Sequence, residues 1–119
     1  MADWDELAEA LADYTVSCNE NQRLRKMQRD WSRTLHFICS DTGKTFSMMV
    51  ERGEILTTPE GHAGTPDIVV TTDSETFCDM FWGDLNPSER YMTGEITLAG
   101  SQHDVMRIDA MTMVAFLDR

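Results

Sequence analysis

The sequence has no apolar run that approaches the roughly 20 residues needed to span a bilayer. Its first 20 residues carry acids instead of the basic start of a signal peptide, and its end lacks a Ser-Lys-Leu peroxisomal address. The three cysteines, Cys18, Cys39 and Cys78, contain no C-x-x-C pair, which disfavours a disulfide or zinc framework and favours reduced thiols. These absences predict a cytoplasmic protein.

Positive charge is scarce, because 10 Lys and Arg stand against 21 Asp and Glu and give a formal net charge of −11. Such a charge repels phosphate backbones, so nucleic acid is not an expected partner. His36, His62 and His103 lack the spacing of metal ligands, and we expect neither a metal nor a cofactor. Ser101, His103 and Asp104 are the residue types of a catalytic triad, but neighbours at one helix start cannot converge on one substrate atom. The sequence therefore predicts a protein that is not an enzyme.

Two further patterns suggest chemistry but have simpler interpretations. Gly43-Lys44-Thr45 ends like a phosphate-binding loop, yet the first glycine of that motif is missing and the segment joins two predicted strands, so we interpret it as a turn. Cys78 lies near a predicted helix start and would be reactive if exposed, but its apolar neighbours favour a buried, inert thiol.

At 119 residues the chain is long enough to bury the core of one domain, which we place at residues 1–119. Apolar residues at steps of three and four predict a helix at residues 3–14. Residues 31–40 and 45–50 have strand patterns and are joined by a glycine-containing turn, which predicts an antiparallel hairpin. A third short strand is expected around Ile55.

The loop at residues 58–66 contains two Gly and two Pro and has little to bury, so we expect it to be mobile. The β-branched residues that follow, at 67–72, predict a strand. Thr72 and Glu75 have the spacing of a capping box, which predicts a helix that starts there and ends at Gly83.

The Asn-Pro pair at 86–87 predicts the start of a shorter helix that ends at Gly94. Alternating polar and apolar residues at 95–99 predict a strand with one buried face. Ser101 and Asp104 are spaced as the cap of a last helix.

A Gly-x-Leu-Asn-Pro core at residues 83–87 is followed by an aromatic-Met-Thr-Gly sequence and then by a strand that ends in Gly. With this order of residues, the chain resembles the sterol carrier protein type 2 domain family over residues 30–110. His103 and Asp104 depart from the family, which has mostly small or apolar residues at that turn. The segments that carry the resemblance are Asp73-Ser74-Glu75, Phe77, Gly83-Asp84-Leu85-Asn86-Pro87, Tyr91-Met92-Thr93-Gly94, Glu95-Ile96-Thr97-Leu98-Ala99-Gly100 and Val105-Met106-Arg107-Ile108.

The resemblance implies an α+β domain with a mostly antiparallel five-stranded sheet. It implies that helices cover one face of this sheet and leave an apolar tunnel, which holds a sterol, a fatty acyl chain or another lipid. The expected lipid-binding residues are Phe77, Met80, Phe81, Met92, Leu98, Met106 and Met113.

Methionine is unusually abundant, with nine in 119 residues. Such side chains either fill an irregular core or form an adaptable wall around ligands of different shape. The resemblance favours the second interpretation for Met80, Met92, Met106 and Met113, because they fall on elements that are expected to line the tunnel.

Two functions remain open: a carrier of a hydrophobic small molecule, and an accessory domain that uses the same groove for a protein partner or a homodimer. The cluster Arg23, Arg25, Lys26, Arg29 and Arg33 also has two interpretations. The favoured one is a solvated face balanced by the acidic first helix, and the other is a weak docking patch for an anionic membrane surface.

Overall fold

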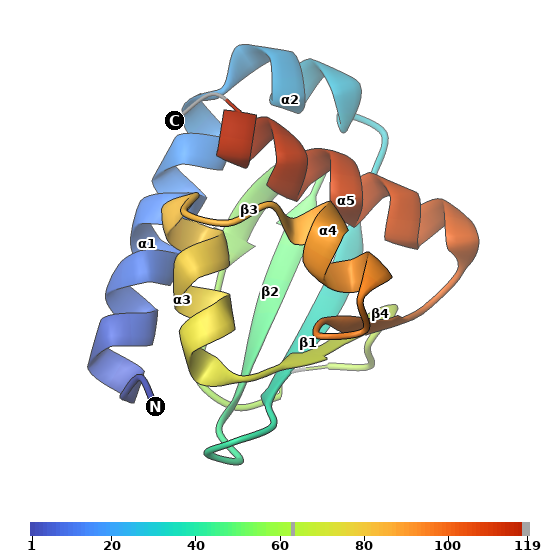
Figure 1. The fold of residues 1–119 in the computed structure, drawn as a ribbon. Helices are drawn as coiled ribbons and strands as arrows, with labels where there is room; N and C mark the ends of the chain where they lie inside the picture. Colours follow the sequence, from blue (N-terminus) through green and yellow to red (C-terminus); the bar gives the residue numbers. More distant parts are fainter. Residues whose placement is uncertain (63, 118–119) are drawn as a thin grey trace.

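The chain forms a five-stranded sheet whose one face is covered by helices (Figure 1). The computed structural model describes residues 1–62 and 64–117. Ala63, inside the loop expected to be mobile, and the C-terminal pair Asp118-Arg119 lie outside the described residues. The elements are α1 (Trp4–Glu20), α2 (Gln22–Met27), β1 (Arg33–Cys39), β2 (Thr45–Glu51), β3 (Glu54–Thr57), β4 (Ile68–Thr72), α3 (Ser74–Trp82), α4 (Pro87–Met92), β5 (Thr97–Ala99) and α5 (Gln102–Leu117).

The strands lie in the order β3-β2-β1-β4-β5. β1 and β2 form the expected antiparallel hairpin, in which Phe37 is opposite Phe46. β4 runs parallel to β1, with Leu35 paired with Ile68, so the prediction of a mostly antiparallel sheet is wrong and the sheet is mixed. The physical reason is the long connection after β3, because a chain that returns to the starting end of the sheet must form its next strand parallel to β1.

The first part of the connection after β3, residues 59–62, lies against the face of the sheet opposite the helices. Ser47 on this face donates its hydroxyl to the Gly61 carbonyl at 2.8 Å. The ring of His62 stacks on the ring of His36 with centroids 4.1 Å apart. Ser47 and His36 are buried, whereas none of the described loop residues is, so the loop has little of its own surface to bury, as expected.

The first helix is longer than predicted because its buried face continues through Tyr14 and Cys18, and it ends at Glu20. Figure 1 shows α1 and α3 side by side in front of the sheet. Within the described residues, no helix combines the length and the apolar character that a membrane crossing requires.

The predicted capping box at Thr72 is wrong by one residue. Asp73 caps α3 and accepts a hydrogen bond from the Thr76 amide at 2.7 Å. Thr72 instead donates its hydroxyl to the Glu95 carbonyl at 2.7 Å, which ties β4 to the segment before β5. Carboxylates and hydroxyls both cap helices well, so local spacing alone did not distinguish the two.

The other predicted helix boundaries are confirmed. α3 ends before Gly83, whose φ of 81° is the left-handed conformation that glycine adopts without strain. Asn86 caps α4, with Pro87 as its first residue. The Ser101 hydroxyl accepts a hydrogen bond from the Asp104 amide at 3.1 Å at the start of α5.

Aromatic rings form the centre of the core. Phe37 and Phe46 stack across the hairpin with centroids 4.6 Å apart. Phe77 and Phe81 of α3 meet this pair edge-on, at centroid distances of 5.4 to 6.0 Å. Tyr14 adds a contact from α1, 5.0 Å from Phe81. The rings thus join the hairpin to α1 and α3.

Candidate functional site

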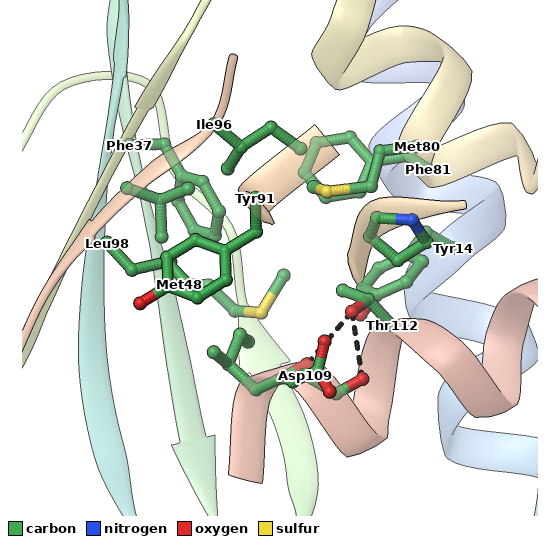
Figure 2. A pocket seen from close by; sticks show the side chains of 13 residues that line it. Tyr14, Phe37, Met48, Met80, Phe81, Tyr91, Ile96, Leu98, Asp109 and Thr112 are labelled. Carbon is green, nitrogen blue, oxygen red and sulfur yellow. Dashed lines mark hydrogen bonds between the residues drawn. The ribbon is translucent and has the colours of Figure 1, made fainter. Parts of the chain in front are cut away.

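A cavity lies between the inner face of the sheet and the surrounding helices (Figure 2). Because strand side chains alternate between faces, β1 and β2 present Phe37 and Met48 to it. The helices close it from the other side. The 13 lining residues are Tyr14, Phe37, Met48, Val70, Met80, Phe81, Pro87, Tyr91, Ile96, Leu98, Ile108, Asp109 and Thr112.

The cavity is narrow, with a free volume of about 30 Å³. This volume holds about two water molecules, so a longer apolar molecule enters only if the walls move. Met48 and Met80 are unbranched and can adopt new rotamers. The short helix α4 is the outermost part of the wall, and its Tyr91 is 42% exposed. Movement of α4 would therefore enlarge the cavity with the least loss of packing.

Tyr14 is the most deeply buried polar residue of the lining, with 0% of its surface exposed. Its hydroxyl has no hydrogen-bond partner among the described residues. Burial raises the pKa of Tyr14 well above its ordinary value, and the nearby Cys18 thiol adds to this effect. The thiol and the hydroxyl do not have the geometry of a hydrogen bond. The hydroxyl is therefore a neutral donor inside an apolar wall.

Asp109 of α5 is a second polar group of the lining. Its Oδ1 atom accepts a hydrogen bond from the Ser88 hydroxyl at 2.6 Å, which links α5 to α4. The Thr112 hydroxyl, one turn further along α5, donates to the carbonyls of Ile108 and Asp109. Together with the partly exposed Tyr91, these three polar side chains interrupt an otherwise apolar lining.

The predicted lipid-binding residues lie in different places. Met80, Phe81 and Leu98 line the cavity. Phe77 is fully buried among the aromatic rings and does not reach it. Lipid binding by these residues stays a prediction.

Three predicted methionines lie away from the lining. Met92 at the end of α4 is 86% exposed and Met106 on α5 is 65% exposed. Met113 is partly buried beside the lining residue Thr112. α5 turns Ile108 and Thr112 towards the cavity, and residues at other angles around the helix point elsewhere.

Sequence reasoning missed the contributions of the first half of the chain. The resemblance points to lining residues after position 66. The sequence therefore predicted a helix and a hairpin around Tyr14, Phe37 and Met48, but no part of the cavity wall. The apolar stripe of α1, which ends in Tyr14 and Cys18, was the available signal.

Asp104, which departs from the family pattern, does not face the cavity. It accepts hydrogen bonds from Trp31 Nε1 at 3.0 Å and from Arg33 Nε at 2.9 Å. Burial alone would raise the pKa of the Asp104 carboxyl, but the hydrogen bonds from Trp31 and Arg33 and the charge of Arg33 outweigh burial and lower it. This network fixes the start of α5 to β1.

The structure also locates the residues that the sequence offered as a reactive thiol or as metal ligands. Burial raises the pKa of the Cys78 thiol to about 11, which leaves it protonated and unreactive at neutral pH. Over residues 1–62 and 64–117, no three His, Cys, Asp or Glu side chains converge as a metal site. His36 and His62 do meet, but as stacked rings.

A mixed sheet, helices on one face and an apolar cavity between them define a small cavity-containing α+β domain. The chain belongs to the SCP-2 sterol transfer family, whose pattern matches residues 9–112. This confirms the resemblance seen in the sequence. No curated protein sequence matches the chain significantly.

Solved structures share this fold at low sequence identity. A crystal structure of sterol carrier protein 2 has a TM-score of 0.68 and 17% identity, and the match covers 91% of this chain and 94% of that one. The ubiquinone synthesis protein UbiJ-SCP2 has a TM-score of 0.71 and 12% identity, with 92% and 94% covered. Palmitated SCP2L2 from Aedes aegypti has a TM-score of 0.68 and 14% identity, with 93% and 95% covered. At these identities the likeness establishes the fold alone.

Proposed function

We propose that the domain binds a lipid or another hydrophobic small molecule in this cavity and carries it without converting it. The cavity itself carries the proposal. All of its 13 lining side chains except Tyr14, Asp109 and Thr112 present mainly carbon or sulfur. Membership of a sterol transfer family and the palmitated relative support it. Removing about 300 Å² of apolar ligand surface from water contributes about 7 kcal/mol before the cost of ordering, which is the scale of micromolar binding.

In this proposal Met80, Phe81 and Leu98 contact the ligand directly. Phe77 does not contact the ligand but packs against Phe81, since the two rings stack with centroids 6.0 Å apart. Met92, Met106 and Met113 contact the ligand only when α4 has moved, because none of them lines the cavity in the structure.

The test uses the neutral apolar fluorophore N-phenyl-1-naphthylamine. Leu98→Asp places a carboxylate at the cavity and is expected to weaken fluorophore binding at least ten-fold, because the charge loses its hydration. The matched control is Leu56→Asp, since Leu56 is an exposed strand leucine that does not line the cavity. Equal binding by both variants, at unchanged thermal midpoints, would contradict the proposal.

The second candidate is an accessory domain that binds a protein partner or a second copy of itself. Tyr91, Met92 and Met106 are exposed apolar side chains on α4 and the neighbouring α5. A partner's apolar helix could cover them, as helix-in-groove recognition does. The likeness to a ubiquinone synthesis protein shows that the fold also occurs in biosynthetic proteins. Lipid in an organic extract of the purified protein favours the carrier, and a concentration-dependent dimer favours the second candidate.

We also propose that the basic end of the molecule, around α2, would meet an anionic membrane surface. Basic side chains gather around α2, where Arg25, Arg33 and Arg107 form ion pairs with Glu54, Asp104 and Asp30. Lys26, Arg29 and Arg52 are exposed beside them. The acidic start of α1 does not fold over this basic end, since it lies at the opposite end of α1 (Figure 1).

A further inference from the structure

The two walls of the cavity have different chemistry. The sheet side presents Phe37, Met48, Val70 and Leu98, and it is apolar throughout. The helix side carries Tyr14, Thr112 and Asp109 together, as Figure 2 shows. Apart from the Tyr91 hydroxyl, a bound molecule therefore meets polar groups only on the side of Tyr14, Thr112 and Asp109.

The Tyr14 hydroxyl is the first part of the argument. Buried polar groups almost always have a hydrogen-bond partner, and this one has none among the described residues although the residue is wholly buried. Because Tyr14 lines the cavity, a group inside the cavity can supply the missing acceptor. Burial also raises the pKa of this hydroxyl, so it keeps the proton that it would donate.

Asp109 is the second part. Ser88 occupies its Oδ1 atom, and its Oδ2 atom has no hydrogen-bond partner within the part of the chain that the structure describes. None of the 13 lining residues is Lys, Arg or His. A carboxylate ligand would therefore meet an acceptor of its own charge and no cation, in a molecule whose formal net charge is −11.

We infer that the cavity is selective for a neutral lipid with one hydroxyl group, such as a fatty alcohol or a sterol, over a fatty-acid anion. This inference rests on the proposed function and adds the class of ligand. The ligand oxygen accepts a hydrogen bond from Tyr14, and its proton is donated to Asp109. A hydroxyl is both acceptor and donor, whereas an ether and a carboxylate only accept.

The test compares three ligands of equal chain length on the unmodified protein. 1-Dodecanol, dodecyl methyl ether and dodecanoate each displace N-phenyl-1-naphthylamine, and the concentration for half displacement is measured. Dodecanol is expected to compete about five-fold better than the ether, since one hydrogen bond is lost, and at least ten-fold better than dodecanoate. Equal competition, or a preference for dodecanoate, would overturn the inference but leave the carrier function intact. No binding of the fluorophore or of any of the three ligands would overturn both.

Variants separate the two polar groups. Tyr14→Phe is expected to weaken dodecanol and the ether by about five-fold each, since both accept from the Tyr14 hydroxyl. Asp109→Asn is expected to improve dodecanoate binding by at least five-fold. The matched control is Thr15→Val, which removes the neighbouring hydroxyl of α1. Thr15 does not line the cavity and donates to the Leu11 carbonyl, so this variant should bind all three ligands as the unmodified protein does.

Thermal unfolding distinguishes a binding role from a structural one. Tyr14→Phe removes no hydrogen bond of the folded protein, so its thermal midpoint should be unchanged or higher. If Tyr14→Phe binds dodecanol as well as Thr15→Val does, the Tyr14 hydroxyl does not contact the ligand and the inference is wrong.

Discussion

Phe81 belongs both to the aromatic core and to the cavity wall. Its ring contacts Tyr14, Phe37, Phe46 and Phe77, and it is buried. Phe81→Ala should lower the free energy of unfolding in urea by about 3 to 5 kcal/mol, as core aromatic truncations do. Tyr91→Ala, at a half-exposed lining position, should cost less than about 1.5 kcal/mol. A small loss for Phe81→Ala would mean that the ring mainly borders empty space.

Asp104 should make stability depend on pH. Its pKa is lowered in the folded protein, so its contribution is present above the unfolded value of about 3.9 and is lost as pH falls through the lower folded value. Asp104→Asn should cost about 2 kcal/mol at pH 6, a modest value because Arg33 is 35% exposed.

The measurement is urea unfolding of both proteins from pH 6 to pH 3. The difference between them should shrink below about pH 4, where the unmodified carboxyl also takes up a proton. The exposed Glu51→Gln is the control and should follow the unmodified protein. A constant difference at all pH values would mean that the lost contacts are not those of the ionised carboxyl.

Single residues were predictable where the cause is local. Gly83, Asn86 and Ser101 act within a few residues of their own positions, and each boundary was predicted correctly. Asp104 was not predictable in this way, since Trp31 and Arg33 are more than 70 positions away in the sequence. Its role depends on where α5 starts relative to β1.

α4 is the shortest helix of the cavity wall, with six residues, and its last two, Tyr91 and Met92, are exposed. The hydrogen bond from Ser88 to Asp109 is a direct side-chain link between α4 and α5. Ser88→Ala should lower local stability by about 1 kcal/mol and speed amide exchange of residues 88–94 about five-fold. Thr93→Ala is the control, since its hydroxyl bonds only to Arg90 of the same helix. Unchanged exchange in Ser88→Ala would show that α4 is held by packing alone.

Strand pairing was predictable only where neighbours in sequence pair. The hairpin of β1 and β2 was predicted from its glycine-containing turn and from the strand patterns on either side of it. The parallel pairing of β1 with β4 depends on a connection that crosses the sheet, for which the sequence has no local signal. The same limit applied to the cavity, because its lining is brought together from four strands and four helices that are distant in sequence.

On the scale of the whole molecule, charge is divided unevenly. Exposed cations near α2 include Lys26 and Arg29, while the net charge remains −11. Each cation close to an anionic bilayer contributes about 1 kcal/mol, so we expect weak binding to phosphatidylserine vesicles at low salt and none at physiological salt. Co-sedimentation measures this binding. The double variant Lys26→Glu with Arg29→Glu should abolish it, and Lys44→Glu, outside the basic end, should not. Binding that persists in the double variant would assign the contact to another surface.

The cavity receives its lining from both sides of the connection at residues 58–66. Tyr14, Phe37 and Met48 precede it, and the other lining residues follow it. A chain that has folded only its first half therefore has three of the 13 lining residues and nothing to enclose. If fragments 1–62 and 63–119 are made separately, we expect neither to brighten N-phenyl-1-naphthylamine and their mixture to do so. Loading would then be the last event in the maturation of each molecule, so a bound lipid would mark the chains that have finished folding.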